Sequence, residues 1–322
     1  MNTIFTYQWH IKIISLLLIL STFFSCVYFN TFYNAEYSYK KAIKIIEESP
    51  ILEEDQISTQ AKKLLGESID NSKIVLRKYP DSKYIDDAIF IIAKASFLRD
   101  EIAVSESYFN QIIRDYPQSE YYTSSKIWLI YTQLRMGLVD TAKVQIEDLL
   151  KNFEHDDNEL YLIHNIMAEI YLEKDSLQNT YIHYEKAADF TPSKSKQIAT
   201  YGKLVKIAES NNNKQKASQY LVMLADVAPT KIRIDSQMKW ISYQRELGNY
   251  EKIISEIQRM LSLTEYTSEF LRLELELGKV FKDRGELEQA KEIFSQLVDN
   301  YNKKAETAEA SLVLSVVEPN AS

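Results

Sequence analysis

The sequence has few of the residues that form tight or irregular backbone. Its 322 residues include six glycines and six prolines, which is about 2% of each, against typical values of about 7% and 5%. Sandwiches, barrels and glycine-rich phosphate loops all need more of them, and no G-x-G-x-x-G or P-loop motif is present. The scarcity favours helices joined by short turns.

Cysteine is nearly absent as well. Cys26 is the one cysteine, so an intrachain disulfide and a cysteine-based zinc site are excluded. The four histidines lack the spacing of a zinc helix, no nucleophile elbow occurs, and the acidic run 154–159 lacks the glycine and carboxylate spacing of a calcium loop. We therefore predict no metal, no cofactor, no catalytic residues and no enzymatic activity.

Basic residues are also in the minority. There are 38 lysines and arginines against 46 acidic residues, which gives a formal net charge of −8. A nucleic-acid-binding protein normally shows a basic face, so we expect no nucleic-acid partner. The 45% hydrophobic and 26% charged content is ordinary for a folded chain.

The N-terminus predicts an export signal followed by a lipid anchor. Residues 13–24 form an apolar run of 12 residues, which suits a signal peptide and is short for a membrane span. Ser25 and Cys26 then resemble a bacterial lipobox, although Phe23 stands where leucine is usual. We predict that residues 1–25 are a lipoprotein signal peptide and that Cys26 is acylated. The alternative is an uncleaved membrane helix that extends through Phe29.

A repeat of 37 residues runs through the rest of the chain. The segments 79–84 (YPDSKY) and 116–121 (YPQSEY) lie 37 residues apart, and residues 80–301 divide into six units of that length. With Pro80 as position 1, position 3 carries residues that cap helix N-termini: Ser82, Ser119, Asp156, Ser193, Thr230 and Thr267. Position 21 mostly carries turn residues: Asp100, Gly137, Lys174, Asn211, Gly248 and Gly285.

The last unit resembles a tetratricopeptide repeat. Its matching residues are Leu277, Gly278, Phe281, Gly285, Ala290, Phe294 and Leu297. The resemblance implies an all-α fold of helix-turn-helix repeats stacked into a right-handed superhelical solenoid. Residues 26–79 are predicted to follow the signal peptide as a lipid-anchored N-terminal segment. Helical periodicity within them predicts an atypical capping hairpin. Residues 302–322 are predicted to form a capping helix and tail.

The same resemblance implies a binding groove on the inner, concave face, where positions 11 and 15 point. The candidate partner-binding residues are Phe90, Ile127, Tyr131, His164, Tyr171 and Tyr201. An aromatic groove suits an extended peptide or a partner helix, and the alternative is that these side chains are core between repeats. Position 15 has no asparagine, which argues against a clamp for chaperone tails.

Aromatic residues also follow Cys26 closely. They are Tyr28, Phe29, Phe32, Tyr33, Tyr37 and Tyr39. Two interpretations remain open: a segment at the level of the lipid headgroups or a docking strip, and simple packing of the capping hairpin.

The lipobox and the Y-P-x-S-x-Y linkers together resemble the BamD (YfiO) family of outer-membrane assembly lipoproteins. That resemblance implies a non-enzymatic scaffold that faces the periplasm from the outer membrane, binds a β-barrel insertase and helps deliver its substrates. Val27 after the cysteine agrees with the outer membrane, by resemblance to enterobacterial lipoproteins. The alternative is an envelope adaptor for peptidoglycan enzymes or the Tol-Pal system, similar to YbgF, although residues 30–48 lack the heptads of that family.

Overall fold

The structure is a computed structural model that describes residues 30–48, 57–191, 193–301 and 305–317. These residues are helices and short connections, without a strand, which confirms the predicted all-α class. The predicted signal peptide and Cys26 lie outside the described residues. The chain divides into two compact units, Met1–Lys196 and Gln197–Ser322.

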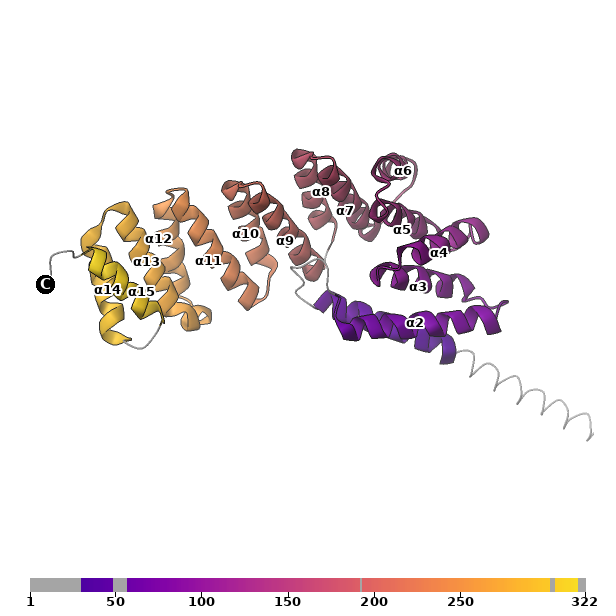
Figure 1. Ribbon diagram of the computed structural model, residues 1–322, viewed down its shortest axis with the longest axis horizontal. Helices are drawn as coiled ribbons and strands as arrows, with labels where there is room; N and C mark the ends of the chain where they lie inside the picture. The colour runs from indigo at the N-terminus through magenta and orange to yellow at the C-terminus, as the bar shows by residue number, and fades with distance from the viewer. Residues whose placement is uncertain (1–29, 49–56, 192, 302–304, 318–322) are drawn as a thin grey trace, which may run out of the picture. The chain divides into compact units, whose positions relative to one another are not determined.

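The first unit is a row of antiparallel helices, each packed on the next (Figure 1). Residues 30–48 form its first helix. The others are α2 (Thr59–Lys78), α3 (Ile85–Leu98), α4 (Ile102–Asp115), α5 (Tyr122–Arg135), α6 (Val139–Asn152), α7 (Asp157–Glu173) and α8 (Leu177–Phe190).

The second unit continues the same pattern. Helix α9 (Lys194–Ser210) begins at the end of the first unit, and the remaining helices follow it. They are α10 (Lys214–Val227), α11 (Thr230–Glu246), α12 (Tyr250–Leu261), the short 3₁₀ helix η1 (Thr264–Glu269), α13 (Phe270–Arg284), α14 (Leu287–Asn300) and α15 (Ala305–Val317). Helix α15 packs on α13 and α14.

The turn inside each helical pair contains one residue with a positive φ. These residues are Asp100, Gly137, Asp175, Asn212, Gly248 and Gly285. Four of them are the residues predicted at position 21, and in the two middle units the turn lies one residue later. Lys174 keeps a φ of −96° and Asp175 takes the value of 53°, because a short polar side chain tolerates the left-handed region better than lysine.

The helix starts agree less well with position 3. Asp156 caps α7 by accepting from the Glu159 amide at 2.8 Å. Ser82 and Ser119 instead accept from amides two residues later, ahead of the caps of α3 and α5. Thr230 is the first residue of α11, and Thr267 lies inside η1. The predicted linkers are therefore real turns, but only some of these residues cap a helix.

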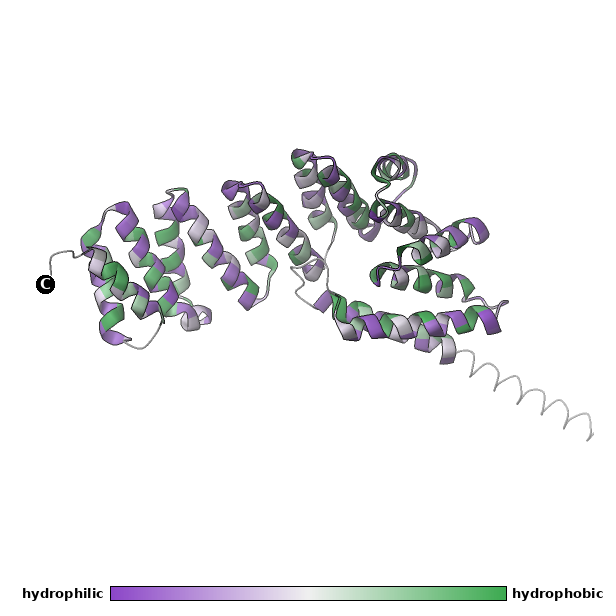
Figure 2. Ribbon diagram, in the orientation of Figure 1, coloured by the Kyte–Doolittle hydropathy of each residue, from purple (hydrophilic) through white to green (hydrophobic). Residues whose placement is uncertain are grey.

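The core lies between successive helices, whose hydrophobic and hydrophilic residues alternate in keeping with their packing (Figure 2). The last pair shows why its sequence pattern needs a glycine. A Cβ on Gly278 in α13 would lie 2.5 Å from the ring of Phe294 in α14, and that ring is fully buried. Ala290 and Leu297 complete this core.

The helix of residues 30–48 packs on α2 and α3. Ala35 and Ala42 are fully buried, and Ser68 of α2 donates to the Ala35 carbonyl at 2.8 Å. Phe32 stacks on Tyr84 with 4.5 Å between ring centroids. In the ranges that the structure describes, no helix combines the length and the apolar character needed to cross a bilayer.

Candidate functional site

A lysine held among aromatic rings lies at position 15 of the first repeat, a position that the sequence resemblance predicts to face inward. Lys94 occupies position 15 in α3, and its Nζ lies 4.8 Å from the ring centroid of Trp128, 5.5 Å from that of Phe90 and 5.9 Å from that of Tyr39. The rings come from α5, α3 and the helix of residues 30–48. A cation over aromatic faces is stabilised by the ring quadrupoles.

This ammonium is short of counter-charge. Within the described ranges Lys94 makes no ion pair or hydrogen bond through Nζ. Burial lowers the pKa of Lys94 to about 8, and the negative charge of Glu47 offsets part of that effect. Burial has removed most of the water that would solvate this ammonium. An incoming carboxylate would therefore stabilise its charge through a charge-assisted hydrogen bond.

A second cation lies on the same face. Lys196, at the start of α9, places its Nζ 4.9 Å from the ring centroid of Tyr161. Burial lowers its pKa, with Glu47 opposing and Lys94 adding to the shift. Ser195 donates a hydrogen bond from its Oγ to the Glu47 carbonyl. The end of the first helix and the start of α9 therefore meet near both lysines.

The aromatic cluster continues from Lys94 along α3 and α5, with Phe97 buried inside it. Phe97 contacts Trp128 and Tyr131, with centroid distances of 5.2 and 4.9 Å. The Tyr131 hydroxyl donates to Glu169 of α7 at 2.9 Å. Phe90 stacks on Tyr121 at 4.4 Å. Phe90 and Tyr131, two of the predicted residues, are both half-buried and lie around or next to the Lys94 site.

Two histidines pair in the α7–α8 hairpin. Their Nδ1 atoms are 3.0 Å apart, so one imidazole donates and the other accepts. Burial is the largest cause that lowers the pKa of each to about 4. The charge of Lys186 lowers both pKa values further, and His183 also lowers that of His164. The predicted residue Tyr171 stacks on His183 at 5.3 Å. His164 is 6% exposed, so this predicted residue joins two helices and offers little surface to a partner.

The two other predicted residues lie elsewhere. Ile127 is fully buried in the core of α5, α6 and α7. This corrects its assignment to the groove, because a side chain without exposed surface cannot contact a partner. Tyr201 is half-buried in α9, in the part of the helix that belongs to the second unit.

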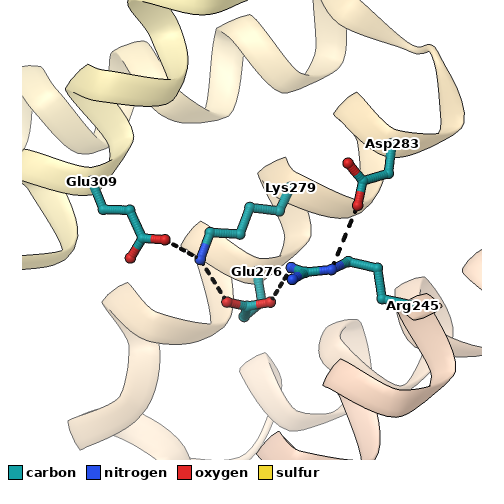
Figure 3. A network of polar contacts seen from close by, with 5 residues as sticks. All are labelled: Arg245, Glu276, Lys279, Asp283 and Glu309. Carbon is teal, nitrogen blue, oxygen red and sulfur yellow. Dashed lines mark hydrogen bonds and ion pairs between the residues drawn. The ribbon is translucent and has the colours of Figure 1, made fainter.

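In the second unit, position 15 has different surroundings (Figure 3). Lys279 of α13 pairs with Glu276 at 2.8 Å and with Glu309 of α15. Arg245 of α11 bonds Glu276 at 2.7 Å and approaches Asp283 at 3.5 Å. The lysine charge is thus already neutralised by carboxylates, and Lys279 is less suited than Lys94 to receive an external anion.

Sequence reasoning missed part of the site. Lys94 shares position 15 with Tyr131, and that spacing was the signal that could have found it. Trp128 lies three residues before Tyr131 on the same helix face. Glu47 and Lys196 could not be found in this way. The contact between Glu47 and Ser195 joins residues 148 positions apart, and a 37-residue repeat does not predict such a contact.

The site offers cations and aromatic faces. Among the described residues, no group of three or more His, Cys, Asp or Glu side chains could hold a metal ion. The arrangement can bind: two lysines attract carboxylates, and the rings provide apolar contact area.

The comparisons with known proteins agree with the helical repeats. The family model described as "Tetratricopeptide repeat" matches residues 87–119 and 274–303, which fall in the pairs α3–α4 and α13–α14. No curated protein matches the sequence significantly.

Solved structures add similar proteins at low identity. A tetratricopeptide repeat protein from Parabacteroides merdae is 12% identical, with a TM-score of 0.37 and coverage of 88% of this chain and 98% of that chain. An assembly chaperone of RpL4 (Acl4) is 12% identical, with a TM-score of 0.28 and the same two coverages. The two segment matches identify tetratricopeptide repeats at residues 87–119 and 274–303, within an all-α architecture.

Proposed function

We propose that this chain is a non-enzymatic, lipid-anchored scaffold at the periplasmic face of the outer membrane, and that it takes part in the assembly of β-barrel proteins. Partners bind the inner face of the first unit. The observation that carries the binding role is Lys94, which is held among three rings without an ion pair in the described residues.

The chemistry of this face favours an extended peptide with a carboxylate. The carboxylate pairs with Lys94, and neighbouring apolar side chains pack on Phe90 and Trp128. The protein as a whole carries a net negative charge, whereas Lys94 and Lys196 make this face locally positive. The face is therefore specific for partners that present a carboxylate.

The membrane role rests on the sequence. The apolar run 13–24, the lipobox-like Cys26 and the Y-P-x-S-x-Y linkers support a BamD-like lipoprotein. Labelling of cells with a radioactive fatty acid tests the anchor, since a Cys26→Ser variant should lose all label. If the label persists, or the variant is still cut and stays membrane-bound, the lipoprotein assignment is wrong.

Affinity purification from detergent-solubilised envelopes, followed by mass spectrometry, tests the partner. Recovery of a large barrel protein with periplasmic domains supports the role in barrel assembly. Recovery of Tol-Pal components or cell-wall enzymes without that barrel supports instead the alternative adaptor role.

A matched pair of variants locates the binding face. Lys94→Gln removes the ammonium with little change in volume, and we expect it to lose the partner. Lys279→Gln removes the lysine at the same position of the last repeat, where carboxylates already pair it, and should retain the partner. Equal recovery with both variants would contradict binding at Lys94.

A further inference from the structure

The first helix divides its aromatic residues between two faces. Phe32 is 8% exposed and Tyr39 packs into the core with α2 and α3. Tyr33 and Tyr37 point the other way and are 51% and 52% exposed. The two interpretations left open by the sequence therefore apply to different residues: hairpin packing explains Phe32 and Tyr39 and leaves the exposed tyrosines unexplained.

The exposed tyrosines form one surface. Their rings stack with 6.1 Å between centroids, and the Nζ of Lys41 lies 5.8 Å from the ring centroid of Tyr37. Lys40 and Lys44 continue the exposed stripe along the helix, each within ion-pair distance of a glutamate on the same helix, Glu36 and Glu48. Elsewhere in the first unit the exposed large hydrophobic residues are more scattered: Val104 and Val144 are isolated, Met136 and Leu138 flank one turn, and Phe153 is a single ring beside Lys126. Scattered residues of this kind are normal on a protein surface.

This combination of residues matches a lipid headgroup region better than a protein interface. Tyrosine has an apolar ring and a polar hydroxyl, and it is enriched where a membrane meets water. Lysine is depleted from protein interfaces but is attracted to anionic phospholipids. The strip formed by Tyr33, Tyr37 and Lys41 also begins seven residues after Cys26.

We propose that this tyrosine strip lies against the phospholipid headgroups of the membrane that holds the Cys26 lipid. The inference rests on the proposed function, because the anchor brings the strip to the membrane. The strip then adds a second membrane contact to the acyl chains and orients the first helix along the surface, where a lipid alone would leave the protein free to turn.

The test uses the full chain, purified with its lipid and reconstituted into vesicles of phosphatidylethanolamine and phosphatidylglycerol. Asn34→Cys places a spin label beside the two tyrosines at an exposed position, and Asn110→Cys places one at an exposed position of α4. Acylated Cys26 does not react with the label. The relaxation of each spin label by oxygen, which concentrates in lipid, is compared with its relaxation by a nickel complex, which stays in water. The ratio shows whether the label lies in lipid or in water.

We expect oxygen to relax the label at position 34 more strongly than nickel does, and nickel to relax the label at position 110 more strongly than oxygen does. Combined Tyr33→Ser and Tyr37→Ser changes should abolish the oxygen preference at position 34 while the protein still floats with the vesicles. If the wild-type label at position 34 is as open to nickel as the control on floating protein, the strip does not touch lipid and the inference is wrong.

Two further outcomes also overturn it. A position-34 label that is open to nickel on vesicles but shielded in native envelopes indicates a protein partner in place of lipid. Protein that fails to float with the vesicles contradicts the lipid anchor itself, and therefore the membrane part of the proposed function.

Discussion

Replacement of Gly278 by alanine tests the close approach of α13 and α14. The added methyl would lie 2.5, 2.9 and 3.0 Å from three atoms of the Phe294 ring, whereas carbon atoms normally approach to about 3.5 Å. Phe294 is fully buried, so its ring has no free space to enter. We expect the helices to separate or the ring to leave its rotamer.

The magnitude follows from two opposing contributions. Overpacking of a filled core costs about 1–3 kcal/mol, and alanine favours a helix over glycine by about 1 kcal/mol. Because the contact is short by about 1 Å, we expect overpacking to dominate, with a net loss of about 1–2 kcal/mol. Gly66→Ala in α2 is the matched control: its Cβ would meet the terminal nitrogen of the Arg99 side chain at 3.0 Å, which can move. That variant should be stabilised by up to about 1 kcal/mol.

Hydrogen exchange is the suitable assay, because arrays of repeats need not unfold in one step. Amides of α13 and α14 should lose roughly tenfold in protection in Gly278→Ala, since about 1.4 kcal/mol corresponds to a factor of ten. Phe294→Leu should reduce the effect of Gly278→Ala in a double-mutant cycle. The reasoning is refuted if Gly278→Ala raises protection as Gly66→Ala does, or if the two changes are additive.

Three further predictions concern the first unit. Burial lowers the pKa of His164 and His183 from 6.5 to about 4, so the unfolded chain takes up protons between these values while the folded unit does not. Its stability should be complete above pH 6.5 and fall by roughly 2–4 kcal/mol by pH 5 in urea titrations, and less in a His183→Asn variant. Lys94→Met should raise stability at pH 7 by about 1 kcal/mol in the same titrations while partner binding is lost, because the methionine removes a buried charge; lower stability would contradict this. Asp175→Gly should stabilise the unit by about 0.5–1 kcal/mol, because Asp175 has a φ of 53°, which glycine adopts without strain. Gly137→Ala at the equivalent turn should destabilise the unit. If the two changes have the same effect on stability, the backbone at Asp175 is not strained.

The sequence predicted those parts of the structure that depend on neighbouring residues. The turn glycines Gly137, Gly248 and Gly285 have positive φ as expected, because few other residues adopt that backbone without strain. The repeat pattern marked Gly278 as the small residue and Phe294 as one of the large ones between the helices, and the structure shows that these two meet. The one-residue shift at Asp175 was harder to place, since a fixed period of 37 residues cannot show which of two adjacent positions takes the left-handed conformation.

Periodicity was a weaker guide to the site. It assigns side chains to a helix face, but it does not separate a half-buried Tyr131 from a fully buried Ile127, which depends on how closely the next helix packs. It also gave no sign that His164 finds a partner in His183, because that contact depends on the side-chain positions of two facing helices.

The contact between Glu47 and Ser195 has a consequence for how the first unit moves. It closes a loop of 148 residues, whereas hydrogen bonds between adjacent repeats, such as Tyr121 to Asp87 and Tyr131 to Glu169, close loops of 34 to 38 residues. Two doublings of loop length add about 1.2 kcal/mol of closure entropy, which is as large as the net contribution of about 1 kcal/mol from one hydrogen bond. We therefore expect the contact between Glu47 and Ser195, beside Lys94 and Lys196, to open more readily than the hydrogen bonds between adjacent repeats.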